Sequence, residues 1–156
     1  MTSSIHQRRI YQQIILEHSK NPQNRGKTNP VDGYHRGHNP MCGDTIELTI
    51  QLYPTGDRIE DIKFEGTGCA IAIASADLMA DTVRGKSIAE ALSMVEDFRE
   101  IITGQGEFSQ TLPKLNALQG VSQFPVRIKC ATLSWHTLKA VLGKSPALAN
   151  SYSKLN

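Results

Sequence analysis

The most regular pattern of hydrophobic and polar positions runs from Asp44 to Leu52. Apolar side chains fall on alternate residues with polar side chains between them, so that Ile46, Leu48, Ile50 and Leu52 alternate with Glu47, Thr49 and Gln51. A period of two residues is typical of a strand with one buried face. We therefore expect a half-buried strand whose even-numbered side chains point into the core.

A second strand is predicted over residues 58–65, after a turn at residues 53–57. Ile62 and Phe64 would face inward, and the charged residues that flank them would face outward. Ile59 is out of phase with this pattern, which indicates a β-bulge or a strand that starts one residue later. Together the two strands predict an antiparallel hairpin with one face in water.

Apolar residues three and four positions apart predict helices elsewhere in the chain. These helices cover residues 5–19, 70–84, 88–102 and 113–119, and a final helix begins at Cys130. Residues 27–38 are polar and are expected to form a loop or a short irregular strand, and residues 105–111 a loop. Residues 124–129 are predicted to be extended, because a residue that precedes proline avoids the helical conformation.

The length and composition suit one compact domain. The chain has 156 residues, of which 39% are hydrophobic and 21% charged, as in ordinary globular proteins. We expect the domain to span residues 1–143 and to be followed by a polar tail at 144–156. A formal net charge of +2 gives no reason to expect a nucleic-acid partner.

The cysteine count and the N-terminal sequence bear on the compartment. No apolar run approaches 18 residues and the N-terminus lacks the apolar core of a secretory signal, so we expect a cytoplasmic protein without a membrane partner. Three cysteines are spread along the chain. In that setting metal binding or thiol chemistry is a better expectation than disulfides.

Cys42 and Asp44 are the first candidates for that chemistry. Both have the parity of the inward-facing strand residues, provided that the extended backbone continues back through Gly43. A carboxylate directed at a core is costly unless a cation receives it. Thiolate and carboxylate are both zinc ligands, so a metal ion would supply that charge.

The other two cysteines, Cys69 and Cys130, each stand at the start of a predicted helix. Free N–H groups and the helix dipole favour a thiolate there, and Lys129 and Arg127 would further lower the pKa of Cys130. The alternative is that each cysteine is a small buried hydrophobic residue, which is what free cysteines usually are. The spacings match no local zinc motif. We favour a shared site because all three cysteines lie at element boundaries, with an inward-facing Asp44 nearby.

Three motifs carry a resemblance to a known family. Asn39-Pro-Met-Cys-Gly-Asp44, Gly66-Thr-Gly-Cys69 and Arg127-Ile-Lys-Cys-Ala-Thr-Leu-Ser-Trp135 closely resemble the U-type iron–sulfur cluster assembly proteins (IscU/SufU). The resemblance extends from His18 to Leu142. It is to the SufU branch, because Lys129 stands where the IscU branch has histidine and residues 107–121 resemble a SufU-specific insertion.

The resemblance implies a single-domain α+β fold of SufE/NifU-like type, with helices packed on one face of a small antiparallel sheet. It implies that Cys42, Asp44, Cys69 and Cys130 are the metal or cluster ligands and that the ion is zinc. It further implies that Cys42 accepts sulfane sulfur from a SufS-like cysteine desulfurase. Ala70 and Ala72 depart from the family pattern, since many relatives have serine there.

Two functions remain open within this frame. One is a zinc-dependent sulfurtransferase, in which Cys42 attacks a desulfurase persulfide. The other is a scaffold that binds a transient [2Fe–2S] cluster on the same ligands and passes it to a downstream scaffold or to apo-proteins. Three thiolates and one oxygen ligand suit a cluster that must be handed on, since stable clusters usually have four thiolates. A cysteine hydrolase is remote, because no oriented histidine base is evident among His35, His38 and His136.

The three cysteines are also expected to have different roles. Cys42 lies on a loop beside a glycine, whereas Cys69 and Cys130 are expected at helix starts, where movement would disturb caps worth about 1 kcal/mol each. We therefore expect Cys42 to leave the ion and carry sulfur while Asp44, Cys69 and Cys130 hold the metal. Lys129 and Arg127 would support the charge of the site without being ligands, and His136 is expected to be a surface residue.

Overall fold

The computed structural model describes residues 2–104 and 113–143. Helices and strands follow one another in the order α1 (Thr2–Lys20), β1 (Gly33–Asn39), β2 (Asp44–Leu52), β3 (Ile59–Thr67), α2 (Ala70–Val83), α3 (Ile88–Ile102), the 3₁₀ helix η1 (Pro113–Gln123) and α4 (Pro125–Gly143). The three strands form one antiparallel sheet in the order β1-β2-β3. The α+β fold expected from the family resemblance is confirmed.

The β2–β3 hairpin agrees with the alternation in the sequence. Leu48 pairs with Phe64 and Ile50 with Ile62, and all four side chains are buried. The register shifts between Gln51 and Leu52, so that Leu52 pairs with Ile59. This irregularity agrees with the predicted bulge, and β3 also starts at Ile59, one residue later than predicted, so that the out-of-phase Ile59 faces the core.

Strand β1 lies where the sequence predicted a loop or an irregular strand. Its inward positions include Gly33 and Gly37, because α4 packs directly on this strand. A Cβ atom on Gly37 would lie only 2.1 Å from Oγ1 of Thr137 on α4. The strand therefore has no apolar stripe, although one of its faces is covered.

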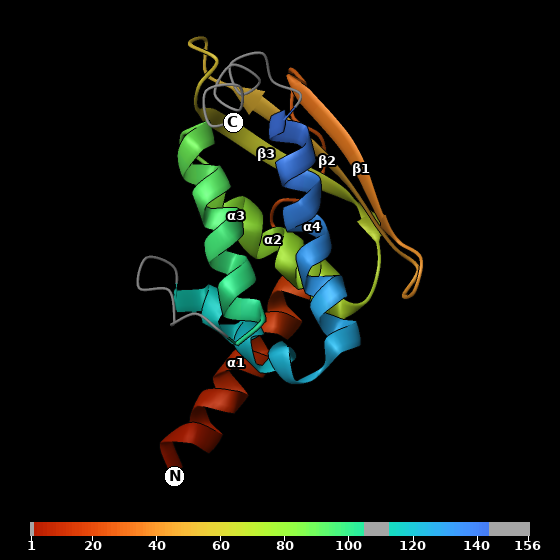
Figure 1. Cartoon of the computed structure of the whole chain (residues 1–156), viewed down its shortest axis with the longest axis vertical. Helices are drawn as coiled ribbons and strands as arrows, with labels where there is room; N and C mark the ends of the chain where they lie inside the picture. The colour runs from red at the N-terminus through yellow and green to blue at the C-terminus, as the bar shows by residue number, and fades with distance from the viewer. Residues whose placement is uncertain (1, 105–112, 144–156) are drawn as a thin grey trace.

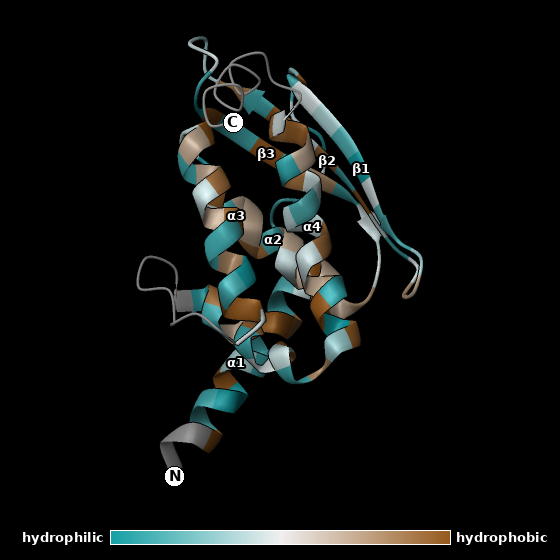
Figure 2. Ribbon diagram, in the orientation of Figure 1, coloured by the Kyte–Doolittle hydropathy of each residue, from teal (hydrophilic) through white to brown (hydrophobic). Residues whose placement is uncertain are grey.

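The helices cover one face of the sheet (Figure 1). Helix α4 crosses β1 and β2, α2 packs against β3, and α1 runs along α2. Helices α3 and α4 join through stacked rings of Phe98 and Trp135, whose centroids are 4.4 Å apart. Apolar residues coloured brown occur on the helices and on the strands they cover (Figure 2), and buried residues of β2, β3, α2, α3, η1 and α4 form one core between helices and sheet.

The start of α4 differs from the prediction. The helix begins at Pro125 rather than at Cys130, so the expectation that residues 124–129 are extended is wrong. Proline restricts the residue before it, here Phe124, but its own fixed φ suits the first turn of a helix, where its missing N–H costs nothing. Cys130 consequently lies in the second turn of α4 and not at the helix start.

The remaining elements agree with the sequence more closely. Ser87 and Glu90 form the predicted capping box of α3. The helix predicted over 113–119 is the 3₁₀ helix η1, which ends at Gln123, includes residues 113–121 of the predicted insertion and packs on α1 and α3. The predicted loop at 105–111 and the polar tail at 144–156 lie outside the described residues. Among the described residues, no helix is long and apolar enough to span a membrane.

Candidate metal centre

Cys42 lies on the tight loop that joins β1 to β2. The Gly43 N–H donates a hydrogen bond to the Asn39 carbonyl (2.9 Å), and Gly43 has a φ of +72°, which favours glycine. The backbone therefore turns at Gly43, and the expected extended path through this residue is wrong. The turn nevertheless directs Cys42 toward the helices, while leaving it exposed.

Asp44 is the first residue of β2, and its side chain faces inward as predicted. It is completely buried, and its Oδ1 accepts a hydrogen bond from the Cys69 N–H (2.9 Å). The other carboxylate oxygen, Oδ2, is buried without a hydrogen-bond partner among the described residues. A buried carboxylate with one unpaired oxygen is costly unless a cation compensates it.

Gly68 allows this close approach between Asp44 and the start of α2. A Cβ atom at Gly68 would lie 2.7 Å from Oδ1 of Asp44. Cys69 occupies the N-cap position of α2, as the sequence predicted, but its side chain makes no capping hydrogen bond. The Asp44 carboxylate instead accepts the Cys69 N–H, and the positive end of the helix dipole favours a negative charge there.

Cys130 brings the third thiol to the same place from α4. Its Sγ lies 3.1 Å from Sγ of Cys42, and its side chain is fully buried. Burial raises the pKa of the Cys130 thiol above its ordinary value, and the neighbouring thiols and carboxylate raise it further. The expected lowering of this pKa is therefore wrong for the metal-free chain, because Cys130 is neither exposed nor at a helix start.

The four predicted ligands are thus neighbours. One ligand atom each from Cys42, Asp44 and Cys130 lie within 4.8 Å of one another, close enough for one metal ion. The Cys69 thiol lies outside that group of three, but its side chain is a neighbour of Cys130 and its N–H contacts Asp44. The set has three soft sulfur donors and one oxygen, which is a chemistry that zinc accepts.

Both cationic residues predicted to support the site are exposed, and Lys129 lies beside the loop that carries Cys42. Nζ of Lys129 is 3.7 Å from Sδ of Met41, the residue before Cys42. The Arg127 side chain makes no hydrogen bond or ion pair with any residue in the described part of the chain. The supporting role of both residues stays a prediction.

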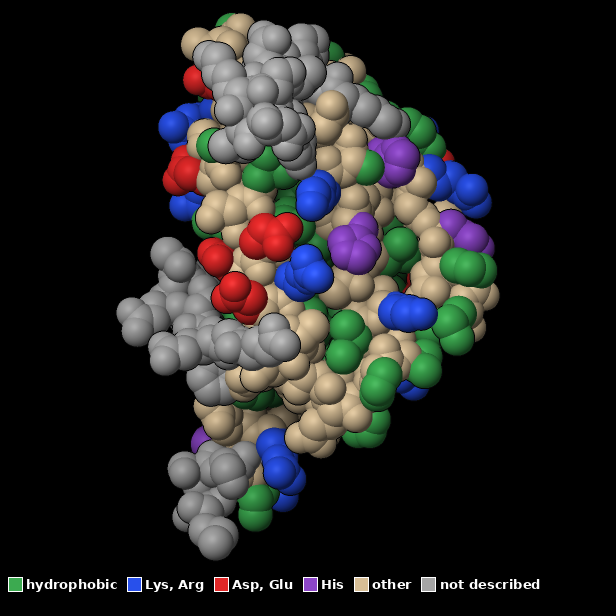
Figure 3. All heavy atoms as spheres, in the orientation of Figure 1, with side chains coloured by type: hydrophobic (Ala, Val, Ile, Leu, Met, Phe, Trp, Pro, Cys, Tyr) green, Lys and Arg blue, Asp and Glu red, His purple; other side chains and the backbone are tan. Residues whose placement is uncertain are grey.

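His136 lies on the exposed side of α4, as predicted. It borders a small cavity with Glu96, Arg99 and Lys139, and partial burial and the two cations lower its pKa. Figure 3 shows acidic and basic side chains interspersed on this face of α3 and α4. His136 does not belong to the cysteine cluster.

Sequence reasoning missed one side chain at the centre. Asn39 is buried, donates from Nδ2 toward the Cys130 sulfur (4.0 Å) and accepts the Met41 N–H at Oδ1 (3.2 Å). It was part of the first motif, but no role could be assigned before β1 was known to pair with β2. The register places Asn39 directly opposite Asp44.

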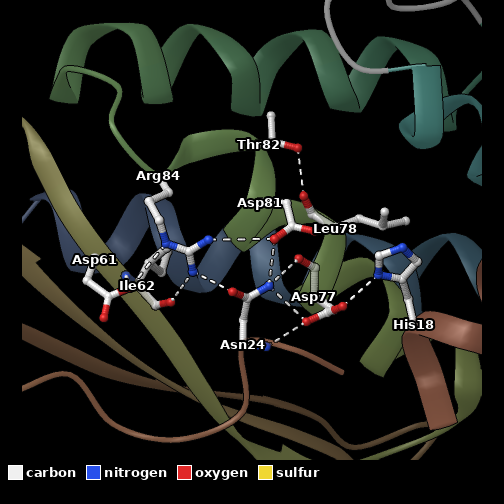
Figure 4. A network of polar contacts seen from close by, with 9 residues as sticks. All are labelled: His18, Asn24, Asp61, Ile62, Asp77, Leu78, Asp81, Thr82 and Arg84. Carbon is white, nitrogen blue, oxygen red and sulfur yellow. Dashed lines mark hydrogen bonds and ion pairs between the residues drawn. The ribbon is translucent and has the colours of Figure 1, made fainter. Parts of the chain in front are cut away.

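A second cluster of possible ligands lies between α1 and α2 (Figure 4). Nδ1 of His18 is 2.6 Å from Oδ2 of Asp77, and Asn24 donates its side-chain amide to Oδ1 of Asp77 (2.9 Å). Arg84 pairs with Asp81 and Asp61 and donates to Asn24. These polar groups already satisfy one another, so the network fastens α1 and the following loop to α2.

Comparison with known proteins identifies the family. The NifU-like N-terminal domain matches residues 10–144 of the chain. The chain belongs to this family. The family membership expected from the three cysteine motifs is therefore confirmed.

Individual relatives cover most of the chain. It is 48% identical over 139 residues to the zinc-dependent sulfurtransferase SufU of Bacillus subtilis, covering 86% of this chain and 90% of that protein. It is 42% identical over 137 residues to the iron–sulfur cluster assembly scaffold protein IscU of Streptococcus pyogenes, covering 87% and 84%. The crystal structure of a putative iron–sulfur cluster assembly scaffold protein for the SUF system from Fervidobacterium islandicum has a TM-score of 0.74 at 36% identity, covering 83% and 93%.

Proposed function

We propose that this protein is a zinc-dependent sulfurtransferase of iron–sulfur cluster assembly, with Cys42 as the residue that accepts sulfur from a cysteine desulfurase. The observation that carries the proposal is the exposed Cys42 thiol beside a buried carboxylate, a buried thiol and a helix-start thiol. The B. subtilis relative bears the same activity in its name.

The donor set fits a zinc ion. Asp44, Cys69 and Cys130 would hold it, with Cys42 as the fourth ligand in the resting protein. The unpaired Oδ2 of Asp44 supports this assignment, because a cation would compensate the buried charge. Bound zinc would keep the thiols as thiolates at neutral pH.

The sulfur-accepting step is thiol exchange. The Cys42 thiolate attacks the outer sulfur of the donor's cysteine persulfide, and a new S–S bond forms. The S–S bond of the donor breaks, and its electron pair leaves with the donor's cysteine sulfur as a thiolate. Cys42 then carries the persulfide, and no net oxidation or reduction occurs.

The three cysteines differ in access, which supports this division of labour. Cys42 is exposed on a short loop, Cys69 is half-buried at the start of α2 and Cys130 is fully buried in α4. A large partner reaches an exposed loop thiol without rearrangement of the fold. Lys129, whose amine lies near Met41, supplies positive charge where the attacking and leaving thiolates meet.

The alternative is a scaffold that binds a transient [2Fe–2S] cluster at the same residues, and it is favoured by the named scaffold relatives. Iron and sulfide would then be cargo, passed on to apo-proteins. Protein purified without oxygen distinguishes the two functions. Stoichiometric zinc without visible charge-transfer bands supports sulfur transfer, and iron with such bands supports the scaffold.

Persulfide mapping tests the proposed step. The protein is incubated with a cysteine desulfurase and cysteine, the thiols are alkylated, and the added sulfur is located by peptide mass spectrometry. We expect it on Cys42, and we expect Cys42→Ala to lose stimulation of the desulfurase. Persulfide mainly on Cys130, or full stimulation by the Cys42→Ala variant, would overturn the assignment.

A further inference from the structure

Asn39 is the last residue of β1, and its side chain lies between the parts of the chain that carry the site. It is 7% exposed, although its neighbours Pro40 and Met41 are exposed. Its backbone carbonyl accepts the Gly43 N–H (2.9 Å) and closes the loop that carries Cys42. Its carbonyl and its amide oxygen therefore bind the loop that carries Cys42, and its amide nitrogen faces Cys130.

The contacts of the side-chain amide fix which atom faces which neighbour. The Met41 backbone N–H is a donor, so the amide atom 3.2 Å from it must be the oxygen. The nitrogen consequently faces Sγ of Cys130 at 4.0 Å, with its hydrogens available to that sulfur. An N–H group that faces a ligand sulfur helps to orient that sulfur.

The same residue thus contacts both of the elements that bring the Cys42 and Cys130 thiols together. Cys42 lies on the β1–β2 loop and Cys130 on α4, and their sulfurs are 3.1 Å apart. One end of the Asn39 amide holds the loop, and the other end faces the α4 thiol. Groups that orient metal ligands in this way are usually worth about 10- to 100-fold in metal affinity.

We propose that Asn39 is a positioning residue that sets the geometry between the Cys42 loop and the Cys130 thiolate, and so tunes both metal affinity and sulfur acceptance. This inference rests on the proposed function. Asn39 acts through the two cysteines and does not itself bind the ion or the sulfur.

Two substitutions separate the two ends of the amide. Asn39→Asp keeps an oxygen for the Met41 N–H but replaces the donor that faces Cys130 with a second oxygen. Asn39→Ala removes both contacts. Thr82→Ala is the matched control, because it removes another buried side-chain hydrogen bond (to the Leu78 carbonyl, 2.6 Å) at the far end of α2.

Zinc affinity is measured by competition with a chelator, and the cobalt(II)-substituted protein reports thiolate coordination through its sulfur-to-metal absorption bands. We expect both Asn39 variants to bind zinc about 10- to 100-fold more weakly, with weaker absorption per cobalt, whereas Thr82→Ala matches the wild type. We also expect Asn39→Ala to lower the maximal rate of persulfide formation on Cys42 more than it raises the KM for the donor.

The outcomes are distinct. Wild-type affinity and cobalt spectra in both Asn39 variants would refute the positioning role while leaving the proposed function intact. Wild-type protein that neither binds zinc nor accepts sulfur would refute the proposed function and this inference with it. If Asn39→Ala does not fold, the Asn39→Asp variant decides the question alone, because it keeps an oxygen for the Met41 N–H.

Discussion

The substitution Asp44→Asn should change stability in opposite directions with and without metal. The asparagine amide keeps the size of the side chain and an oxygen for the Cys69 N–H. It removes a negative charge from a fully buried position where one carboxylate oxygen has no partner. The structure therefore predicts a gain for the metal-free protein and a loss for the metal-bound one.

The magnitudes follow from the contacts. An unpaired buried neutral group costs about 1–3 kcal/mol and an unpaired charged group costs more, so the neutral amide of asparagine replaces the larger cost with the smaller one. The carboxylate gains back about 0.3–1 kcal/mol from the N-terminus of α2, which offsets part of this difference. The metal-free variant should thus be at least as stable as the wild type. With metal at saturation, a 100-fold loss of affinity should remove about 2.7 kcal/mol of stabilisation.

The assay is thermal unfolding of both proteins, with excess zinc and after complete chelation. At this chain length each kcal/mol shifts Tm by roughly 2–4 °C. We expect the variant to melt at or above the wild-type Tm without metal and several degrees below it with zinc. A shift of the same sign and size under both conditions would show that Asp44 is not a metal ligand.

Three further predictions use the same structure. Gly68→Ala should lower zinc affinity at least 10-fold and reduce Tm, because the added Cβ would lie 2.7 Å from Oδ1 of Asp44. Chelator competition measures the affinity and thermal unfolding measures Tm. Wild-type values of both would contradict the close packing of the two residues. Lys129→Gln should keep stoichiometric zinc by elemental analysis, because we expect Lys129 not to be a ligand. It should slow persulfide formation several-fold at low salt, because the Lys129 amine lies beside the loop that carries Cys42. Loss of zinc would refute this role. The metal-free protein should lose stability above about pH 8.5. Burial raises the pKa of Cys130, so above that pH the unfolded chain binds fewer protons than the folded one. Urea unfolding at several pH values measures the free energy of unfolding, and Cys130→Ala should remove this pH dependence.

The local pattern of apolar and polar residues was enough to predict the strands that have one face buried in the core and one face in water. The alternation from Asp44 to Leu52 predicted β2 and the inward direction of Asp44, and the phase error at Ile59 predicted the bulge. The glycine-flanked Cys69 was correctly placed at the start of α2. In these cases the neighbours in sequence are also the neighbours that decide the conformation.

The rest depended on contacts between distant residues. Strand β1 carries glycine where other strands carry apolar residues, because Thr137 of α4 occupies the space of a side chain at Gly37. A proline keeps the residue before it out of the helical conformation, but the proline itself fits the first turn of a helix. At Pro125 the second effect sets the start of α4. The burial of Cys130 and the position of Asn39 follow from these two features, so neither could be predicted from the local sequence.

The ligand set proposed for this site is tested most directly by the zinc K-edge X-ray absorption spectrum of the purified protein. Three thiolates and the Asp44 carboxylate predict three sulfur neighbours at about 2.3 Å and one lighter neighbour at about 2.0–2.2 Å. The spectrum of Cys42→Ala should show one sulfur fewer. A zinc shell with four sulfurs, or with fewer than three in the wild-type protein, would contradict the account.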